Sequence, residues 1–209
     1  MTTTTGPRAE RISRRQVDKF AERRAELADA ALQTLSELGY ARTSLREIAQ
    51  NTEFSHGVLH YYFTDKVDLI THCVRRYKAH CVTRYDQIVA TSTTAAELET
   101  GFAAGLVQTL VEDAPMHRLW YDLRAQSMFE PSFRTDVAEI DDSLERMIWR
   151  IVTRYAELAG GTVTIPSPVM YATFDGLFQQ ALWRHLAGDA DAGRDLQVGT
   201  AQVLARVIG

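Results

Sequence analysis

Polar side chains of several kinds recur at helical spacing between residues 55 and 61, and they offer the most specific chemistry in the chain. A short helix would gather five of them on one face: Ser55, His56, Gly57, His60 and Tyr61. None of the five is acidic, and hydroxyl and imidazole groups hydrogen-bond both to phosphate oxygens and to base edges. The glycine lets the backbone come close to a binding partner. Such a helix would fit the major groove of double-stranded DNA.

Two short helices joined by a tight turn are expected to position this face. Thr43 or Ser44 can cap the first helix, with Glu47 at the spacing of a capping box, and Ser55 can cap the second. Residues 51–53 would form the turn between them. Both helix N-termini would point backbone N–H groups outward, which favours phosphate.

Two such helices bury too little surface alone, so flanking helices must support them. A helix from about Val17 to Leu38 should precede them and end at Gly39, in the left-handed C′ position. A helix capped by Thr64 or Asp65 should follow and continue past Cys81 towards Val89. The small core expected between these helices consists of Ala31, Leu35, Leu45, Ile48, Ala49, Leu59 and Phe63.

These residues resemble the DNA-binding domain of the TetR family of transcriptional regulators, over about residues 20–80. The first part of the family pattern is matched by Gly39-Tyr40, Thr43-Ser44-Leu45 and Ile48-Ala49. The recognition-helix part is matched by Ser55, Gly57, Leu59, His60, Tyr62, Phe63 and Lys66. Two positions depart from the pattern. Glu53 stands where the family usually has glycine, which indicates a different turn or a left-handed residue, and His60 stands where tyrosine is usual.

The resemblance implies which side chains contact DNA. Phosphate contacts are expected from Thr43, Ser44, Tyr62 and Lys66. Base-edge or groove contacts are expected from Arg46, Ser55, His56, Gly57, Val58 and Tyr61, and the His60 imidazole replaces the usual phenol contact. The alternative interpretation is an ordinary helical hairpin inside an all-α core.

Charge is distributed unevenly along the 209 residues. Residues 1–66 carry ten Lys/Arg and nine Asp/Glu, whereas the rest carries thirteen and eighteen, for a net charge of -4. An N-terminal part that meets an anion fits this asymmetry. Residues 1–16 are expected to be a flexible basic arm, and residues 17–66 the helix-turn-helix domain, with the fourth helix leading on from residue 66.

The composition predicts a cytoplasmic protein with no membrane segment. The N-terminus has no apolar signal region, and no apolar run reaches the roughly 18 residues of a membrane span. Cys73 and Cys81 would lie roughly 12 Å apart along one helix, beyond the reach of a disulfide. Both are therefore expected to be free, buried thiols.

Residues 67–209 are expected to form a larger helical domain, because no segment alternates with the period of a strand. Helical spacing recurs to the end of the chain, which predicts an all-α fold of about nine helices. By the resemblance, this domain binds an effector and pairs with a second subunit through its last two helices, in a homodimer. Their apolar faces contain Phe174, Leu177, Phe178, Leu182, Leu196, Val203 and Leu204. A monomer core is the alternative for these faces.

A small-molecule pocket could be lined by Phe102, Trp120, Tyr121, Arg124, Met128 and Phe174. An aromatic set with one arginine would suit an amphipathic or acidic effector of unknown identity. The alternative is plain core packing, with Arg124 in a salt bridge. No metal site or cofactor is expected, because His56, His60, His72, His80 and the two cysteines do not present converging ligands. No catalytic motif is found, so an enzyme is not expected.

The function expected from these observations is sequence-specific binding of double-stranded operator DNA by a transcriptional repressor that a small-molecule effector releases. The competing interpretation is a small-molecule-binding helical protein whose helix-turn-helix is vestigial. The acidic remainder of the chain is the best support for that alternative.

Overall fold

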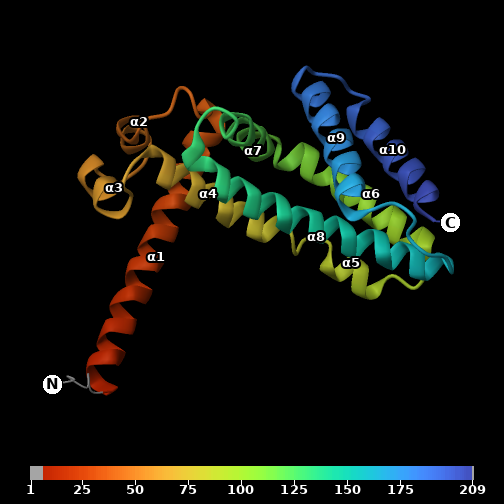
Figure 1. Ribbon diagram of the computed structural model, residues 1–209. Coiled ribbons are helices and arrows are strands. Elements are labelled where there is room, and N and C mark those ends of the chain that lie inside the picture. Colours follow the sequence, from red (N-terminus) through yellow and green to blue (C-terminus); the bar gives the residue numbers. More distant parts are fainter. Residues whose placement is uncertain (1–6, 209) are drawn as a thin grey trace. The chain divides into compact units, whose positions relative to one another are not determined.

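A computed structural model describes residues 7–208, with side chains from Gln16 onward. These residues form ten α-helices, one short 3-10 helix and a single isolated antiparallel bridge, which confirms the all-α prediction (Figure 1). The chain divides into two compact units, residues 1–73 (unit 1) and residues 74–209 (unit 2), and the division falls within helix α4. No described helix is long and apolar enough to cross a membrane.

Unit 1 is built on a long first helix. Its helices are α1 (Pro7–Leu38), α2 (Leu45–Gln50), α3 (His56–Tyr62) and the first part of α4 (Lys66–Cys81). In Figure 1, α1 extends beyond the other helices of its unit towards the N-terminus. Helix α1 begins ten residues before the predicted Val17, so residues 7–16 of the expected flexible arm are helical. Residues 1–6 of that arm lie outside the described residues.

The local signals at the ends of these helices are confirmed. Gly39 has a φ of 73° and donates its N–H to the Leu35 carbonyl at 2.8 Å, which closes α1 with a left-handed residue. Asp65 accepts the Asp68 N–H at 2.9 Å at the start of α4. Glu53 is not left-handed, because no described residue other than glycine has a positive φ. The turn between α2 and α3 therefore accommodates Glu53 without a left-handed residue.

The predicted core of unit 1 is present and slightly larger than expected. Six of its seven residues are buried, and only Ala49 keeps partial exposure. Leu27 and Ala28 of α1 and Leu69, Ile70 and Cys73 of α4 complete it. The thiol of Cys73 donates to the Ala28 carbonyl at 3.3 Å. Neither cysteine forms a disulfide and both are buried, as predicted.

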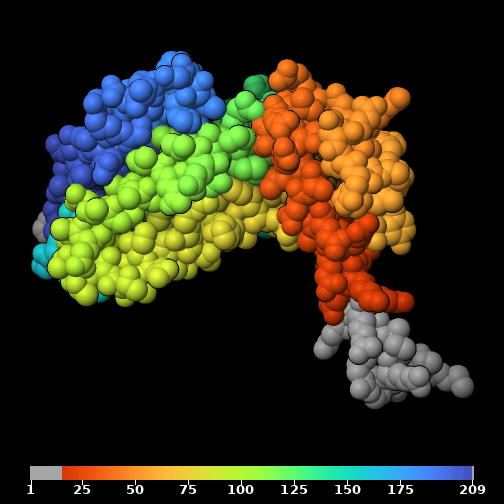
Figure 2. All heavy atoms as spheres, turned by 180° about the vertical axis from the view of Figure 1, so that it is seen from behind, coloured from red at the N-terminus to blue at the C-terminus, as the bar shows by residue number. Residues whose placement is uncertain are grey.

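Unit 2 continues with seven elements after α4. They are α5 (Asp86–Thr91), α6 (Ala95–Glu112), α7 (Ala114–Gln126), the 3-10 helix η1 (Pro131–Phe133), α8 (Arg134–Ala159), α9 (Ser167–Leu186) and α10 (Ala192–Val207). Helix α6 packs on α9 and α10, and α8 packs on α9. Figure 2 shows the side chains of α6 and α10 lying against each other on the rear face of this unit.

The predicted fourth helix is in fact two helices, which raises the number above nine. Helix α4 ends at Cys81, and a turn leads to Tyr85, which is buried and is the N-cap residue of α5. The Tyr85 ring meets Phe102 edge-on, with 5.1 Å between ring centroids. A Cβ on Gly105 would lie 2.8 Å from this ring, so only glycine allows the approach. The tyrosine therefore needs the turn in order to enter the core.

The residues predicted for a dimer interface lie mostly in the core of unit 2. Five are buried within the chain itself: Phe174, Phe178, Leu182, Leu196 and Leu204. Leu177 and Val203 are partly exposed. These five side chains pack within their own unit, where α9 and α10 contact α6, α7 and α8. Pairing of the last two helices with a second subunit stays a prediction.

Candidate DNA-binding surface and ligand cavity

The polar face of α3 is open to solvent. The Ser55 hydroxyl accepts the Val58 N–H at 3.3 Å and so caps the helix. His56 and His60 are exposed, and their rings meet edge-on with 4.4 Å between centroids. A Cβ on Gly57 would meet nothing closer than the Ser55 hydroxyl oxygen at 4.0 Å. Nothing inside the protein therefore requires glycine at this position.

Two tyrosines at the end of α3 join this face to α1. Tyr61 is 73% exposed, and the Tyr62 ring lies beside it with 4.9 Å between centroids. Phe20 of α1 lies 4.8 Å from the Tyr62 ring and 6.2 Å from the Tyr61 ring. The aromatic cluster therefore packs the two tyrosines of α3 against α1.

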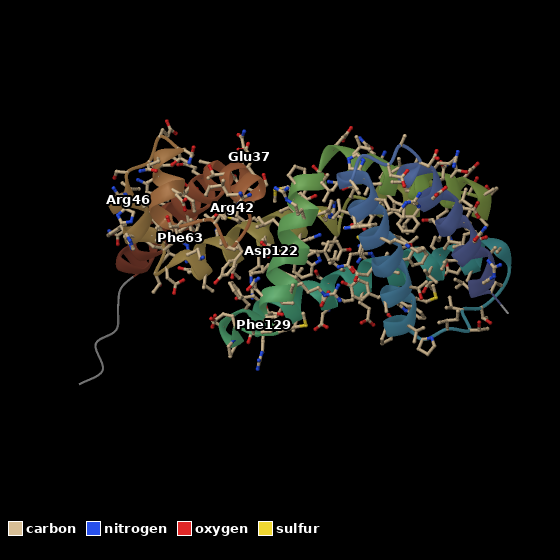
Figure 3. All side chains as sticks on the ribbon, turned by 90° about the horizontal axis from the view of Figure 1, so that it is seen from above. Glu37, Arg42, Arg46, Phe63, Asp122 and Phe129 are labelled. Atoms are coloured by element: carbon tan, nitrogen blue, oxygen red, sulfur yellow. The ribbon has the colours of Figure 1, made fainter. Side chains whose placement is uncertain are left out.

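The start of α2 has a capping box, as predicted. The Ser44 hydroxyl accepts the Glu47 N–H at 3.2 Å and lies 3.0 Å from the Glu47 carboxylate. Arg46 is exposed, and Figure 3 shows its side chain at the outer edge of unit 1. Thr43 is different, because it is buried and its hydroxyl donates to the Gly39 carbonyl at 2.7 Å. Its side chain orders the loop before α2 rather than projecting from the surface.

Lys66 is also engaged within unit 1. Its ammonium donates to the Tyr40 carbonyl at 3.1 Å and lies 4.0 Å from the centre of the Tyr40 ring. The side chain ties the start of α4 to the loop that follows α1. The predicted DNA-contacting set therefore divides into exposed groups on α2 and α3 and two residues, Thr43 and Lys66, that hold these helices in place.

A cavity of about 70 Å³ lies within unit 2. Five helices and the turn after α4 contribute to its wall, and Trp120, Tyr121 and Phe174 of the predicted pocket belong to it. The other three predicted residues do not line it. Phe102 packs behind Phe174, with 5.6 Å between ring centroids, and Met128 is 68% exposed in the turn after α7. In Figure 3 the neighbouring Phe129 projects from the same turn.

Arg124 forms a salt bridge, as its alternative interpretation held. It contacts Asp175 at 2.5 Å and Asp141 at 3.2 Å. Tyr121 donates to the same Asp175 carboxylate at 3.0 Å, and Tyr171 donates to Asp141. Burial raises the pKa of the Asp141 carboxyl. Each oxygen of the two carboxylates thus has a donor from the protein itself.

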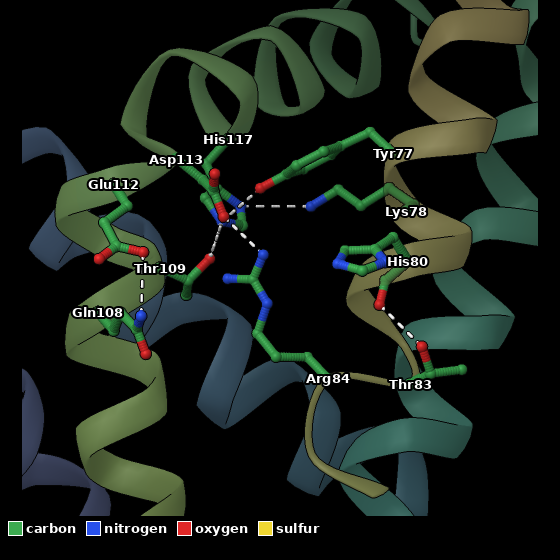
Figure 4. A network of polar contacts seen from close by, with 10 residues as sticks. All are labelled: Tyr77, Lys78, His80, Thr83, Arg84, Gln108, Thr109, Glu112, Asp113 and His117. Carbon is green, nitrogen blue, oxygen red and sulfur yellow. Dashed lines mark hydrogen bonds and ion pairs between the residues drawn. The ribbon is translucent and has the colours of Figure 1, made fainter.

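A second polar network, drawn in Figure 4, includes the cavity-wall residues Lys78, Thr109 and His117. The Lys78 ammonium lies 3.3 Å from His117 Nδ1, and His117 Nε2 lies 2.9 Å from the Thr109 hydroxyl. That hydroxyl donates to Asp113 at 3.1 Å, and Arg84 contacts Asp113 at 2.6 Å. An ammonium can only donate, so Nδ1 accepts and the neutral ring carries its proton on Nε2. Burial, followed by the charge of Lys78, lowers the pKa of His117, which keeps the ring neutral.

Lys78, Thr109 and His117 were not predicted from the sequence. They lie on α4, α6 and α7, and each is buried. The one available signal was the position of Lys78 in the run YKAHC, where a lysine falls among residues of the inner face of a helix. Among the described residues no group of three or more His, Cys, Asp or Glu side chains could hold a metal ion.

A helix-turn-helix unit followed by a separate helical unit with an internal cavity defines the architecture of this chain. Residues 27–73 match the family of bacterial regulatory proteins described as the tetR family. The HTH-type transcriptional regulator BetI of Burkholderia thailandensis is 32% identical over 114 residues, which are 54% of this chain and 58% of BetI. The helix-turn-helix unit of this chain is therefore similar to the DNA-binding domain of TetR-family transcriptional regulators. The chain matches little more than half the length of this curated relative.

Solved structures share the fold over nearly the whole chain. A TetR transcription regulator from Haloarcula marismortui superimposes with a TM-score of 0.73 at 16% identity, covering 90% of this chain and 100% of that one. FadR from Bacillus subtilis, solved with stearoyl-CoA, gives 0.67 at 18% identity, covering 88% and 97%. A proposed transcriptional regulator from Saccharomonospora viridis, solved with choline, gives 0.70 at 18% identity, covering 90% and 98%.

Proposed function

We propose that the chain is a homodimeric repressor that binds operator DNA through α2 and α3 and leaves it when a small molecule occupies the unit 2 cavity. The observation that carries the proposal is the exposed face of α3, where Ser55, His56, His60 and Tyr61 offer hydrogen-bonding groups without an acid. A helix of this kind reads base edges in the major groove. Ser44, the N-cap residue of α2, then reaches an adjacent phosphate. Arg46, for which the resemblance implies a base-edge or groove contact, is reassigned here to phosphate because it is exposed on α2 and not on α3.

Two copies are needed for useful specificity, because one short recognition helix reads few base pairs. The exposed side of α9 offers a surface for pairing. Its exposed residues carry no charge: Pro168, Val169, Ala172, Thr173, Gly176, Gln179, Gln180, Trp183 and Leu186. Trp183 is 71% exposed, and a Cβ on Gly176 would meet nothing within 4 Å. A large apolar anchor beside small residues is typical of a helix that packs closely on another.

The cavity is the proposed effector site, since it is enclosed by aromatic rings and contains a few fixed polar groups. The ligand-bound FadR and Saccharomonospora structures support this assignment by their shared fold. An effector releases DNA if it binds more tightly to a dimer whose two α3 helices have the wrong separation.

Selection from a random pool of DNA duplexes, followed by fluorescence anisotropy, tests the proposal. We expect a near-palindromic sequence to be enriched and to bind far more tightly than a scrambled duplex, with affinity falling as salt rises. Tyr61→Ala should change which sequence is preferred, whereas Arg46→Ala should weaken binding to all sequences. Equal, weak binding to selected and scrambled duplexes would instead favour a small-molecule-binding protein with a vestigial helix-turn-helix.

The dimer is tested separately by sedimentation. Trp183→Glu places a charge on the proposed pairing face and should convert a dimer into a monomer. Trp183→Phe, which keeps the face apolar, is the matched control. A wild-type protein that sediments as a monomer at micromolar concentration would contradict this part of the proposal.

A further inference from the structure

Lys78 is a buried cation at the wall of the cavity. Its side chain is 3% exposed, and its ammonium has one hydrogen-bond acceptor, His117 Nδ1 at 3.3 Å. The rings of Trp120 and Tyr77 lie 5.3 Å and 5.5 Å from the ammonium, measured to ring centroids. An ammonium has three N–H donors. This one therefore reaches the cavity with donors that the described part of the protein does not use.

The acidic residues nearby already have partners of their own. Asp113 is held by Arg84, and Asp175 is held by Arg124 and Tyr121. Within residues 7–208 no carboxylate forms a salt bridge with Lys78. Removal from water disfavours a charged group unless a counter-ion replaces the water. The Lys78 ammonium thus lacks a counter-ion among the described residues.

Most of the remaining wall is apolar. The charged groups that also border it have partners within unit 2, since Arg84 contacts Asp113 and Asp175 contacts Arg124. Besides the Trp120 ring, the cavity wall includes Leu106, Leu144, Met147, Ile148, Phe174 and Phe178. A ligand that pairs with the Lys78 ammonium and also fills the apolar part of the cavity has an anionic end and a hydrocarbon body.

A quaternary ammonium is the natural competitor, because aromatic walls bind such cations and a structure of this fold contains choline. The charges on this wall argue against it. Lys78 would repel the cation, and the oxygens of Asp175 are already hydrogen-bonded to Tyr121 and Arg124.

We propose that the unit 2 cavity binds an apolar carboxylic acid whose carboxylate pairs with the Lys78 ammonium. The inference rests on the proposed function of the cavity as the effector site, and it names the chemical class of the effector. His117 acts as a positioning residue, because its Nδ1 holds the ammonium and its Nε2 is anchored through Thr109 to Asp113.

Calorimetry without DNA tests the proposal. Each acid is compared with an amide of the same shape, and cations are tested beside them. The acids are phenylacetate and octanoate, the neutral probes are phenylacetamide and octanamide, and the cations are choline and benzyltrimethylammonium. We expect at least one acid to bind roughly tenfold to a hundredfold more tightly than its amide. Lys78→Met should abolish this preference, while Arg76→Met removes an exposed cation from the same helix and should leave it unchanged.

Direct observation of the lysine gives a second readout. The chain contains three lysines, so spectra of protein labelled at lysine Cε can be assigned with single variants. Burial lowers the pKa of Lys78 to about 8. A bound carboxylate should raise that pKa, whereas the amide should not. The charged and ionisable groups that surround the Lys78 ammonium are Tyr77, Cys81, Arg84, Asp113, His117, Asp141 and Asp175.

The outcomes separate this inference from the proposed function. Tight binding of a cation, or binding of acids and amides with equal affinity, overturns the carboxylate assignment and leaves the DNA-binding proposal untouched. Failure of both acids to bind also overturns it. An acid that binds with dependence on Lys78, in a protein that prefers no DNA sequence, supports the site and refutes the repressor.

Discussion

Unit 1 and unit 2 treat their polar side chains in opposite ways. On α3, His56, His60 and Tyr61 stay in water until a partner replaces that water. In unit 2, Lys78 and His117 have already lost it, with 3% and 6% of their surface exposed. The exposed polar groups on α3 lower the free energy of unfolding little, because they remain hydrated in the folded protein. The site at Lys78 links ligand binding to folding stability, because a bound anion would supply the counter-ion that this ammonium lacks.

The largest effect is expected from Lys78→Met, which replaces a buried cation by a neutral side chain of similar length. The pKa of Lys78 falls from 10.5 to about 8 on folding. At about 1.36 kcal/mol per unit, the charge lowers the free energy of unfolding by about 3 kcal/mol at neutral pH. The variant should therefore be more stable than the wild type by about that amount, measured by urea unfolding at pH 7.

The sign of the pH dependence follows from the lowered pKa. The penalty is fully present below pH 8 and disappears above about pH 10.5, because the unfolded chain then loses the proton as well. The stability difference between the variant and the wild type should thus shrink as pH rises through this window. Arg76→Met, on the exposed side of α4, should show no such trend. A Lys78→Met protein less stable than the wild type at pH 7 would contradict the statement that the buried charge of Lys78 destabilises unit 2.

Thr109→Val is expected to have the next largest effect. The substitution conserves shape but removes the hydroxyl that connects His117 Nε2 to Asp113. The ring would keep a buried N–H with only the Tyr77 hydroxyl, at 3.2 Å, as a partner. Loss of the buried link should lower the free energy of unfolding by about 1–3 kcal/mol. Thr91→Val, at an exposed position on α5, is the matched control and should stay within about 0.5 kcal/mol of the wild type.

The same contrast explains how far the sequence could be interpreted. The helix-turn-helix residues lie within 28 consecutive positions, and their caps and spacing depend on neighbours in the chain, as at Ser44 and Gly39. The cavity instead collects side chains from five helices. Helical periodicity identifies an inner face, but it does not indicate which inner residue borders a cavity. Trp120 was found because it is aromatic, and Lys78 was missed because lysines are usually exposed.

The side chains of α9 and the end of α4 both show what helical periodicity leaves open. Phe174 and Phe178 were assigned to a partner subunit, yet they pack within their own unit. Periodicity shows that a face is apolar but not which molecule covers it. Likewise, neither glycine nor proline marks the turn between Cys81 and Tyr85. At that turn Tyr85 packs against Gly105, a contact between residues twenty positions apart.

Removing one N-cap side chain from each unit should change the free energy of unfolding less than Thr109→Val does. The pair of variants tests whether the two units unfold together. Ser44 caps α2 in unit 1 and Thr94 caps α6 in unit 2, each by accepting a backbone N–H at 3.2 Å. Ser44→Ala and Thr94→Ala should each lower the free energy of unfolding by about 1 kcal/mol. Hydrogen exchange measured by mass spectrometry should show faster exchange mainly in the unit that carries the change. Equal acceleration across both units would show that they unfold as one.

Gly57→Ala should have the smallest effect on stability and separates folding from DNA binding. Alanine favours a helix by up to about 1 kcal/mol over glycine, and its Cβ would clash with nothing inside unit 1. Thermal unfolding should therefore be unchanged or slightly shifted upward. Affinity for the selected DNA should fall, because the added methyl group lies on the face proposed to approach the major groove. Unchanged affinity would show that the backbone at Gly57 does not come close to DNA, and the open space above it would then need another explanation.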